Sequence, residues 1–190
     1  MSGWGKKGSA LMAGVVLAGL LPAGPAAASV TLTIRLATTS TFKESAGVDF
    51  TCPWNQVLTG RAHKGDENGY TTYYCSRVLF NGEEAQVTVG DWSLGQREDY
   101  STYQAPWNHV LVGRWHTGDE KGITRYRPGT MTWRGRQVYI DMHTWTGPMR
   151  ESSHASHADV DQRQIMTGRI HSGNENGDTK YQYGKIFLYG

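Results

Sequence analysis

Residues 60–73 read Gly60-Arg61-Ala62-His63-Lys64-Gly65-Asp66-Glu67-Asn68-Gly69-Tyr70-Thr71-Thr72-Tyr73, and this stretch occurs three times in the chain. The second copy is Gly113-Arg114-Trp115-His116-Thr117-Gly118-Asp119-Glu120-Lys121-Gly122-Ile123-Thr124-Arg125-Tyr126. The third copy is Gly168-Arg169-Ile170-His171-Ser172-Gly173-Asn174-Glu175-Asn176-Gly177-Asp178-Thr179-Lys180-Tyr181. All three follow the ungapped pattern G-R-x-H-x-G-[DN]-E-x-G-x-T-x-Y. Self-similarity at a fixed period indicates a repeat architecture, so this pattern decides the fold class.

The similarity extends beyond this core on both sides. Downstream, residues 78–82 align with 131–135 and with 186–190. Upstream, each copy has a basic residue followed by an acidic one, and the three pairs are Lys43-Glu44, Arg97-Glu98 and Arg150-Glu151. We therefore expect one domain of three units of about 54 residues, 29–82, 83–135 and 136–190, with no linker between them.

Each unit is expected to contain four short strands. In the first unit, runs of β-branched and aromatic residues predict strands near 30–36, 46–51, 56–63 and 70–80. The last two form a hairpin, because residues 64–69 have the Gly, Asp and Asn composition of a turn. Helical periodicity is missing. Three units of four strands predict an all-β, pseudo-threefold domain, with the β-trefoil preferred and a three-sided β-prism as the alternative.

The N-terminus has the features of a secretory signal peptide. Lys6 and Lys7 precede a short apolar run, and Ala26-Ala27-Ala28 has the form of a cleavage site. We expect residues 1–28 to be removed, cleavage to occur near Ala28, and the mature protein to be secreted without membrane insertion. Cleavage removes two lysines and no acid, which changes 19 basic and 17 acidic residues to 17 of each. A neutral chain has no electrostatic footprint for nucleic acid.

Cys52 and Cys75 are the two cysteines of the chain, and they lie in the same unit. An exported protein permits a disulfide, so we expect a structural bridge between them. This bridge would reinforce one unit only, because the matching positions elsewhere carry other residues.

Strict alternation along the strand near 56–63 predicts two faces. Leu58, Gly60 and Ala62 have apolar counterparts in every copy, which places this set toward the core. Arg61 and His63 then lie on a polar face, with Thr71 and Tyr73 opposite them across the hairpin and Glu67 at its tip. The candidate ligand-binding residues, by unit, are Arg61, His63, Glu67, Thr71 and Tyr73; Arg114, His116, Glu120, Thr124 and Tyr126; and Arg169, His171, Glu175, Thr179 and Tyr181.

Two interpretations of this tripled cluster remain open. In the structural one, the Arg, Glu and Gly residues fix the hairpin and the Tyr packs over the Arg. In the functional one, each unit holds a small polar pocket beside an aromatic ring, which suits a carbohydrate. Three equivalent weak sites would gain strength by multivalency on a glycan or cell-wall surface.

Catalysis and metal binding have little support in the sequence. The chain lacks the G-x-S-x-G, H-E-x-x-H and P-loop motifs. His154, His157, Asp159 and Asp161 form a second polar cluster, but a Ser-rich solvated loop explains them better than a metal site. We therefore expect a non-enzymatic protein that needs no metal and no cofactor.

Trp54 and Trp107 occupy matching positions, whereas the third unit has Gln162 there. They are either exposed ligand platforms or lids over the core at a strand entry, and the second interpretation is favoured. Because the third unit differs, a surface built on these two residues is not threefold.

The repeated R-x-H-x-G-D-E-N-G-x-T-x-Y core resembles that of small secreted proteins of Gram-positive, high-GC bacteria, over the whole mature chain. Its threefold plan is similar to that of secreted β-trefoil lectins, although their Q-x-W repeat signature is absent. The chain also resembles adaptor subunits of umbrella-type secreted toxin particles. These resemblances imply a lectin-like module that recognises a glycan or cell surface, or alternatively an adaptor between secreted protein partners in a multiprotein antibacterial toxin complex.

Overall fold

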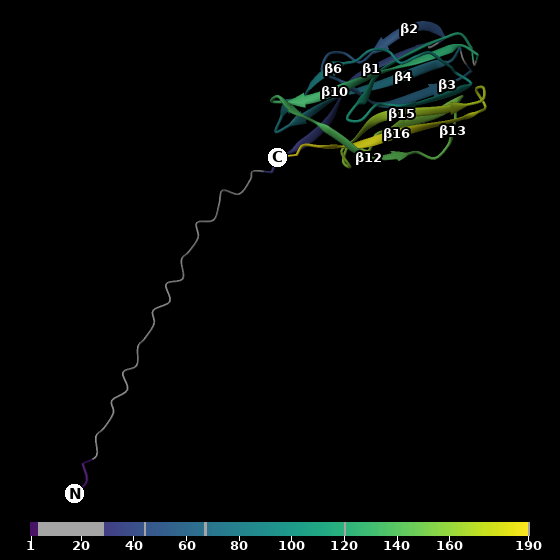
Figure 1. Cartoon of the computed structure of the whole chain (residues 1–190). Helices are drawn as coiled ribbons and strands as arrows, with labels where there is room; N and C mark the ends of the chain where they lie inside the picture. The colour runs from purple at the N-terminus through teal and green to yellow at the C-terminus, as the bar shows by residue number, and fades with distance from the viewer. Residues whose placement is uncertain (4–28, 44, 67, 120, 190) are drawn as a thin grey trace.

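The computed structural model describes residues 1–3, 29–43, 45–66, 68–119 and 121–189, which carry the colours of Figure 1. Within these ranges the chain forms one all-β domain of three antiparallel sheets. The described residues contain no helix. They therefore include no helix that is long and apolar enough to cross a membrane. The predicted signal peptide, residues 1–28, lies outside the described residues apart from its first three.

The three sheets contain five, six and five strands. The first has the order β1 (Leu32–Lys43), β4 (Tyr70–Phe80), β3 (Val57–Lys64) and β14 (Ser153–His157), with β5 (Glu83–Glu84) also paired with β4. The second has the order β11 (Arg136–Gln137), β10 (Ile123–Trp133), β9 (Val110–Thr117) and β2 (Ala46–Thr51), with β6 (Gln86–Val89) and β7 (Gln96–Arg97) also paired with β10. The third has the order β12 (Tyr139–Trp145), β16 (Asp178–Phe187), β15 (Gln164–Ser172) and β8 (Tyr100–Gln104), with β13 (Met149–Arg150) also paired with β16.

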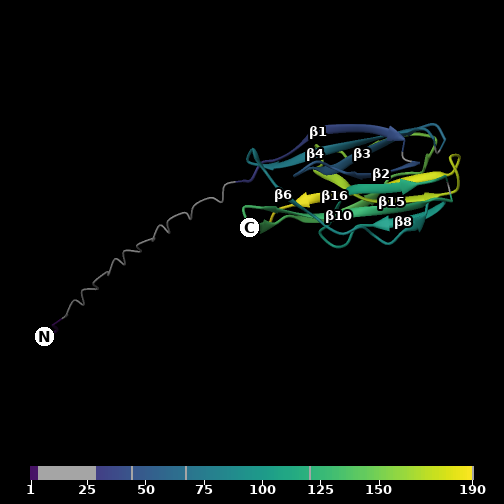
Figure 2. The same ribbon diagram turned by 90° about the horizontal axis from the view of Figure 1, so that it is seen from above.

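Apart from the two-residue strands β5 and β11 at the unit boundaries, each sheet includes one strand from a different unit. The first unit supplies β2 to the second sheet, the second unit supplies β8 to the third, and the third unit supplies β14 to the first. The exchange closes a ring, so each unit completes the sheet of another. Figure 2 shows β1, β4 and β3 along the upper side, with β10, β15 and β16 of the other two sheets below them.

The strands of the first unit agree with the sequence except at β1. The predicted strands 46–51 and 70–80 match β2 and β4, and β3 is displaced by one residue. The prediction ended the first strand at residue 36, and this is wrong, because β1 continues to Lys43. Its Thr- and Ser-rich second half pairs with β4 from Thr38 opposite Cys75 to Lys43 opposite Tyr70. Threonine suits a half-exposed strand, and this pairing supplies the hydrogen bonds that a loop would lack.

The core is divided between two clusters of buried side chains. The first is mainly aliphatic and includes the equivalent residues Val57, Val110 and Ile165. The second includes their neighbours Leu58, Leu111 and Met166, together with Tyr73, Tyr126 and Tyr181. The predicted disulfide is confirmed: Cys52 and Cys75 are bridged within the second cluster, with their Cα atoms 5.8 Å apart.

Candidate functional site

A β-bulge in each central hairpin decides which side chains reach the interior. In β3, Leu58 lies opposite Cys75 and Gly60 lies opposite Tyr74, which leaves Thr59 as an extra residue. The same shift occurs at Val112 in β9 and at Thr167 in β15. An extra residue reverses the alternation of side chains beyond it. Arg61 consequently lies on the same side as Leu58, and both line one small gap in the interior.

The predicted assignment of faces is therefore wrong. The exposed fractions of the three arginines are 2% for Arg61, 3% for Arg114 and 1% for Arg169. The three histidines of the pattern are buried as well, whereas Ala62 and its counterparts are only half-buried. Strict alternation had placed Ala62 toward the core, and the bulge turns it outward instead.

Arginines and glutamates form a shared ion-pair network in the interior. Glu98 Oε2 lies 2.7 Å from Arg114 Nη2, and Glu98 Oε1 lies 2.7 Å from Arg169 Nη1. Glu151 lies 2.9 Å from Arg61 Nη1 and 3.0 Å from Arg169 Nη2. Each of these carboxylates thus bridges arginines of two units. Glu44 is their counterpart in the repeat and lies outside the described residues.

The tyrosines of the repeat connect the three units in the same cyclic order as the exchanged strands β2, β8 and β14. Arg61 Nη1 donates to the Tyr181 hydroxyl at 2.7 Å, and Arg169 Nη1 donates to the Tyr126 hydroxyl at 3.2 Å. Arg114 Nη1 lies 3.4 Å from the Tyr73 hydroxyl. Every arginine therefore contacts the tyrosine of the preceding unit. The repeated residues form one network between units, and not three pockets within units.

Histidines and threonines complete the polar layer. As predicted, Thr71 lies opposite His63 and Tyr73 lies opposite Arg61 across the hairpin, and the other two hairpins repeat this register. His63 Nε2 donates to the Asp66 carbonyl at 3.0 Å, and its Nδ1 lies 2.7 Å from the Thr71 hydroxyl. His171 Nε2 likewise donates to the Gly173 carbonyl at 2.9 Å. These histidines close the hairpin turns.

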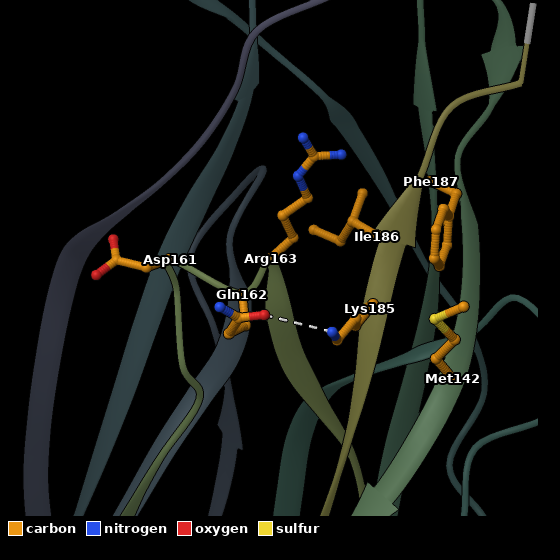
Figure 3. A pocket seen from close by; sticks show the side chains of 7 residues that line it. All are labelled: Met142, Asp161, Gln162, Arg163, Lys185, Ile186 and Phe187. Carbon is orange, nitrogen blue, oxygen red and sulfur yellow. Dashed lines mark hydrogen bonds between the residues drawn. The ribbon is translucent and has the colours of Figure 1, made fainter.

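His154 joins this network from the exchanged strand β14. Its Nδ1 donates to the Glu151 carbonyl at 2.9 Å, and its Nε2 lies 2.8 Å from the Tyr181 hydroxyl and 3.1 Å from Arg61 Nη1. The sequence had suggested a solvated loop here, and that is wrong for residues 153–157, which form β14 along the free edge of β3. Asp161 lies apart, at a hollow beside Arg163 and Lys185 (Figure 3).

The charges of the network shift the pKa values of its members. Burial by itself raises the pKa of Glu98, but Arg114 and Arg169 outweigh it and lower this pKa to about 2. Burial would also raise the pKa of Glu151, but Arg169 and Arg61 hold this pKa well below its usual range. Burial and the neighbouring arginines lower the pKa of His154 and of His171 to about 4. Near neutral pH both glutamates are therefore ionised and both histidines are neutral.

Twelve of the fifteen candidate ligand residues, three from each of the four types Arg, His, Thr and Tyr, belong to this buried layer. Glu175 is half-buried in its turn, where its Oε1 accepts from Asn176 Nδ2 at 2.7 Å. Glu67 and Glu120 lie outside the described residues. Sequence reasoning missed Glu98 and Glu151, although their repetition in phase with the G-R core was a usable signal. Whether any of the fifteen contacts a ligand stays a prediction.

A hollow of about 290 Å³ opens beside this layer, on the outer face of the first sheet. It is lined by Ala62, His63, Lys64, Tyr70, Thr72, Ser153 and His154. Tyr70 is exposed, with Lys43 Nζ 5.8 Å from its ring centroid. Thr72 also shares a hydrogen bond of 2.9 Å with Thr41. The hollow thus combines an aromatic ring, hydroxyl groups and amines.

Small side chains create this hollow in the first sheet. Ala62 lies opposite Thr72 across the hairpin, whereas the equivalent pairs are Trp115 with Arg125 and Ile170 with Lys180. In the second sheet the Trp115 indole donates to the Gly47 carbonyl at 3.2 Å. Arg125 lies 5.3 Å from the centroid of the same ring. The indole and guanidinium cover the region that corresponds to the hollow.

The loops before β3 and β9 carry exposed tryptophans. Trp54 is 80% exposed and Trp107 is 69% exposed, so the favoured interpretation as core lids is wrong. The following Asn55 and Asn108 have positive φ angles of 57° and 58°. Their side-chain oxygens accept from the Val87 and Ile140 amides, at 3.0 and 3.2 Å. These asparagines fix the loop backbone and leave the preceding indoles in solvent.

The third unit keeps this loop geometry with different side chains. Arg163 has a φ of 62°, close to the angles of the two asparagines. Gln162 replaces the tryptophan and accepts a hydrogen bond of 3.4 Å from Lys185 (Figure 3). The loop borders a hollow of about 240 Å³ lined by Met142, Asp161, Gln162, Arg163, Lys185, Ile186 and Phe187. The tryptophan surface is consequently confined to the first two units.

Among the described residues, no group of three His, Cys, Asp or Glu side chains could hold a metal ion. His63, His154 and His171 each donate one ring N–H to a backbone carbonyl. Comparison of the chain with models of protein families, with curated proteins and with solved structures finds no match.

Proposed function

We propose that this protein is a secreted, non-enzymatic binding module that holds a saccharide in the hollow between β3, β4 and β14. The observation that carries the proposal is the combination of the exposed Tyr70 ring with hydroxyl groups and Lys64 in a depression of about 290 Å³. A sugar ring packs its apolar face against an aromatic side chain, while its hydroxyls need several donors and acceptors. The ion pairs of the neighbouring layer support the walls of the site.

The lining also favours a particular class of saccharide. Lys64 is part of the hollow, and Lys43 lies over Tyr70 at its rim. The seven residues that line it include no acid. Amines stabilise carboxylate and phosphate groups, so anionic cell-surface glycans are the expected ligands.

Filling the hollow tests this proposal. Ala62→Trp places in the first sheet the residue that stands at Trp115 in the second. We expect the mature protein to bind anionic glycans on an array, and Ala62→Trp to lose at least about tenfold in affinity because the indole occupies the sugar position. The matched control is Ile170→Trp, the same change at the equivalent position of the third sheet, which should leave binding intact.

Thermal unfolding of both variants shows whether the fold is retained. Glycan arrays and cell-wall pull-downs that both remain empty would exclude the proposed function. Binding that survives Ala62→Trp unchanged would place the ligand elsewhere on the molecule.

A second candidate function is that of an adaptor between secreted proteins, and the exposed indoles of Trp54 and Trp107 favour it. Aromatic side chains are enriched where protein partners bury surface. In this case a protein partner recovered in stoichiometric amounts should be lost with Trp54→Ala/Trp107→Ala and retained with Ala62→Trp. Elution by free sugar would support the saccharide site instead.

Of the two architectures expected from the sequence, we propose the three-sided β-prism over the β-trefoil. Support comes from three sheets that each have their own edges and that exchange one strand in a ring. An experimental structure that showed the central strands closed in a single barrel would favour the trefoil.

A further inference from the structure

The outer edge of β1 is a long strand edge without a partner among the described residues. β1 lies at the end of the first sheet and pairs only with β4, along eleven residue pairs from Leu32 to Lys43. Figure 2 shows it along the upper rim of the molecule. Alternate residues of an edge strand direct their N–H and C=O groups away from the sheet, where they can pair with another chain.

The corresponding edges of the other two sheets are interrupted. In the second sheet, β6 and β7 have four and two residues, and residues 90–95 separate them. Arg127 lies over the Trp92 ring, 5.2 Å from its centroid, within this interruption. In the third sheet, β12 and β13 are separated by Thr146-Gly147-Pro148. Short strands and proline are the usual protection of a sheet edge. β1 lacks both, although it has one bulge at Ala37.

The side chains of β1 leave its edge open to strand pairing. Residues 36–42 are Leu-Ala-Thr-Thr-Ser-Thr-Phe, without a charge or a proline. Leu36 is 55% exposed, and Thr39 is exposed as well. Threonine and other β-branched residues favour extended structure. A neutral strand of this kind is also self-complementary, because no like charges meet in its middle.

We propose that β1 pairs with β1 of a second copy of this chain, antiparallel about a twofold axis between Ala37 and Thr38. In this register Leu36 lies opposite Thr39 of the other copy, and Arg35 lies opposite Ser40. Arg35 and Lys43 of different copies stay three residues apart along the strands, or about 10 Å, which is near the screening length at physiological salt. The first sheets of the two copies join into one continuous sheet, and the twofold contact buries the same surface of each.

Charge reversal across this contact provides the test. In the double variant Leu36→Lys/Thr39→Lys, each new lysine lies directly opposite a new lysine of the other copy, so two pairs of like charges meet across the contact. The double variant Leu36→Glu/Thr39→Glu brings two pairs of glutamates together in the same way. Sedimentation of the mature protein over about a hundredfold range of concentration should show a monomer–dimer equilibrium. Each double variant alone should be monomeric, and an equal mixture of the two should form the heterodimer, because opposite charges then face each other.

The matched control is Gln86→Lys/Thr88→Lys, which adds the same charge to exposed positions of the short strand β6 and should leave the dimer intact. Hydrogen exchange provides a second readout, since dimerisation should protect amides of residues 32–43. A monomer at every concentration would overturn the proposal. A dimer that persists in the double-lysine variant, or a mixture that stays monomeric, would overturn it as well.

Discussion

Arg169 illustrates how single residues stabilise this protein. Its guanidinium contacts Glu98 and Glu151 together, and it is 1% exposed. These carboxylates raise its pKa well above the usual value despite burial. Removing one member of a buried ion pair leaves an uncompensated charge, which is far more costly than losing a surface pair. The polar layer therefore depends on every one of its charges.

Glu151→Gln should destabilise the fold while keeping nearly the same shape. It leaves Arg61 and Arg169 with less negative charge beside them, and we expect the free energy of unfolding to fall by about 3 to 5 kcal/mol. Urea denaturation at neutral pH measures this loss. Glu83→Gln is the control, because its pair with Arg134 is exposed and should contribute about 0–1 kcal/mol. Similar losses in the two variants would contradict the role given to the buried layer.

Stability should also depend on pH in two ranges. His154 and His171 have pKa values of about 4 in the folded protein, below the ordinary value of 6.5. As the pH falls, these histidines therefore bind protons in the unfolded chain first. The free energy of unfolding consequently decreases as the pH drops from 6.5 toward 4. Glu98 has a folded pKa of about 2 against 4.5, so its contribution is complete above 4.5 and is lost as the pH falls toward 2. Chemical denaturation at a series of pH values measures both declines. His171→Gln should reduce the first, and a flat profile between pH 7 and 4 would refute the assignment.

Two backbone features of the hairpins position the network at the scale of the element. The bulges at Thr59, Val112 and Thr167 turn the arginines inward. The tight turns bring the second glycine of each turn against the preceding strand. A Cβ added at Gly122 would lie 1.9 Å from the Thr117 carbonyl oxygen. No ordinary side chain tolerates such a contact, so glycine is required there.

Gly122→Ala should therefore weaken the second hairpin. Relieving the contact needs a backbone shift, and we expect a loss of about 1–3 kcal/mol in the free energy of unfolding. Thermal and urea unfolding measure it. Gly147→Ala is the control, because a Cβ there meets nothing within 4 Å and should change stability by less than about 0.5 kcal/mol. Equal behaviour of the two variants would show that the turn adjusts freely.

At the scale of the whole molecule, the ring of exchanged strands and the ring of Arg–Tyr contacts have the same order. β14 covers the free edge of β3, and Glu151 of the same unit neutralises Arg61 on that strand. Both contacts depend on residues far apart in the sequence. The units also differ where the symmetry is not needed for the fold. Ala62 leaves room for a hollow, and β1 is longer than the strands at the corresponding edges, so the saccharide site and the dimer edge that we propose both lie on the first sheet.

The sequence by itself indicated three repeats, and it determined the all-β class, the central hairpins with the pairing nearest their turns, and the disulfide. Each of these follows from local patterns: a repeat in phase, turn residues, and a pair of cysteines. Only the tertiary structure decided that Arg61 and His63 point inward, that Glu98 and Glu151 meet the arginines, and that residues 153–157 form a strand. One extra residue in a strand reverses its faces, and exchange between units depends on contacts that no local pattern records. The repeated stretch of residues 60–73 thus contributes to a buried layer, while the small Ala62 within it opens the surface where we place the ligand.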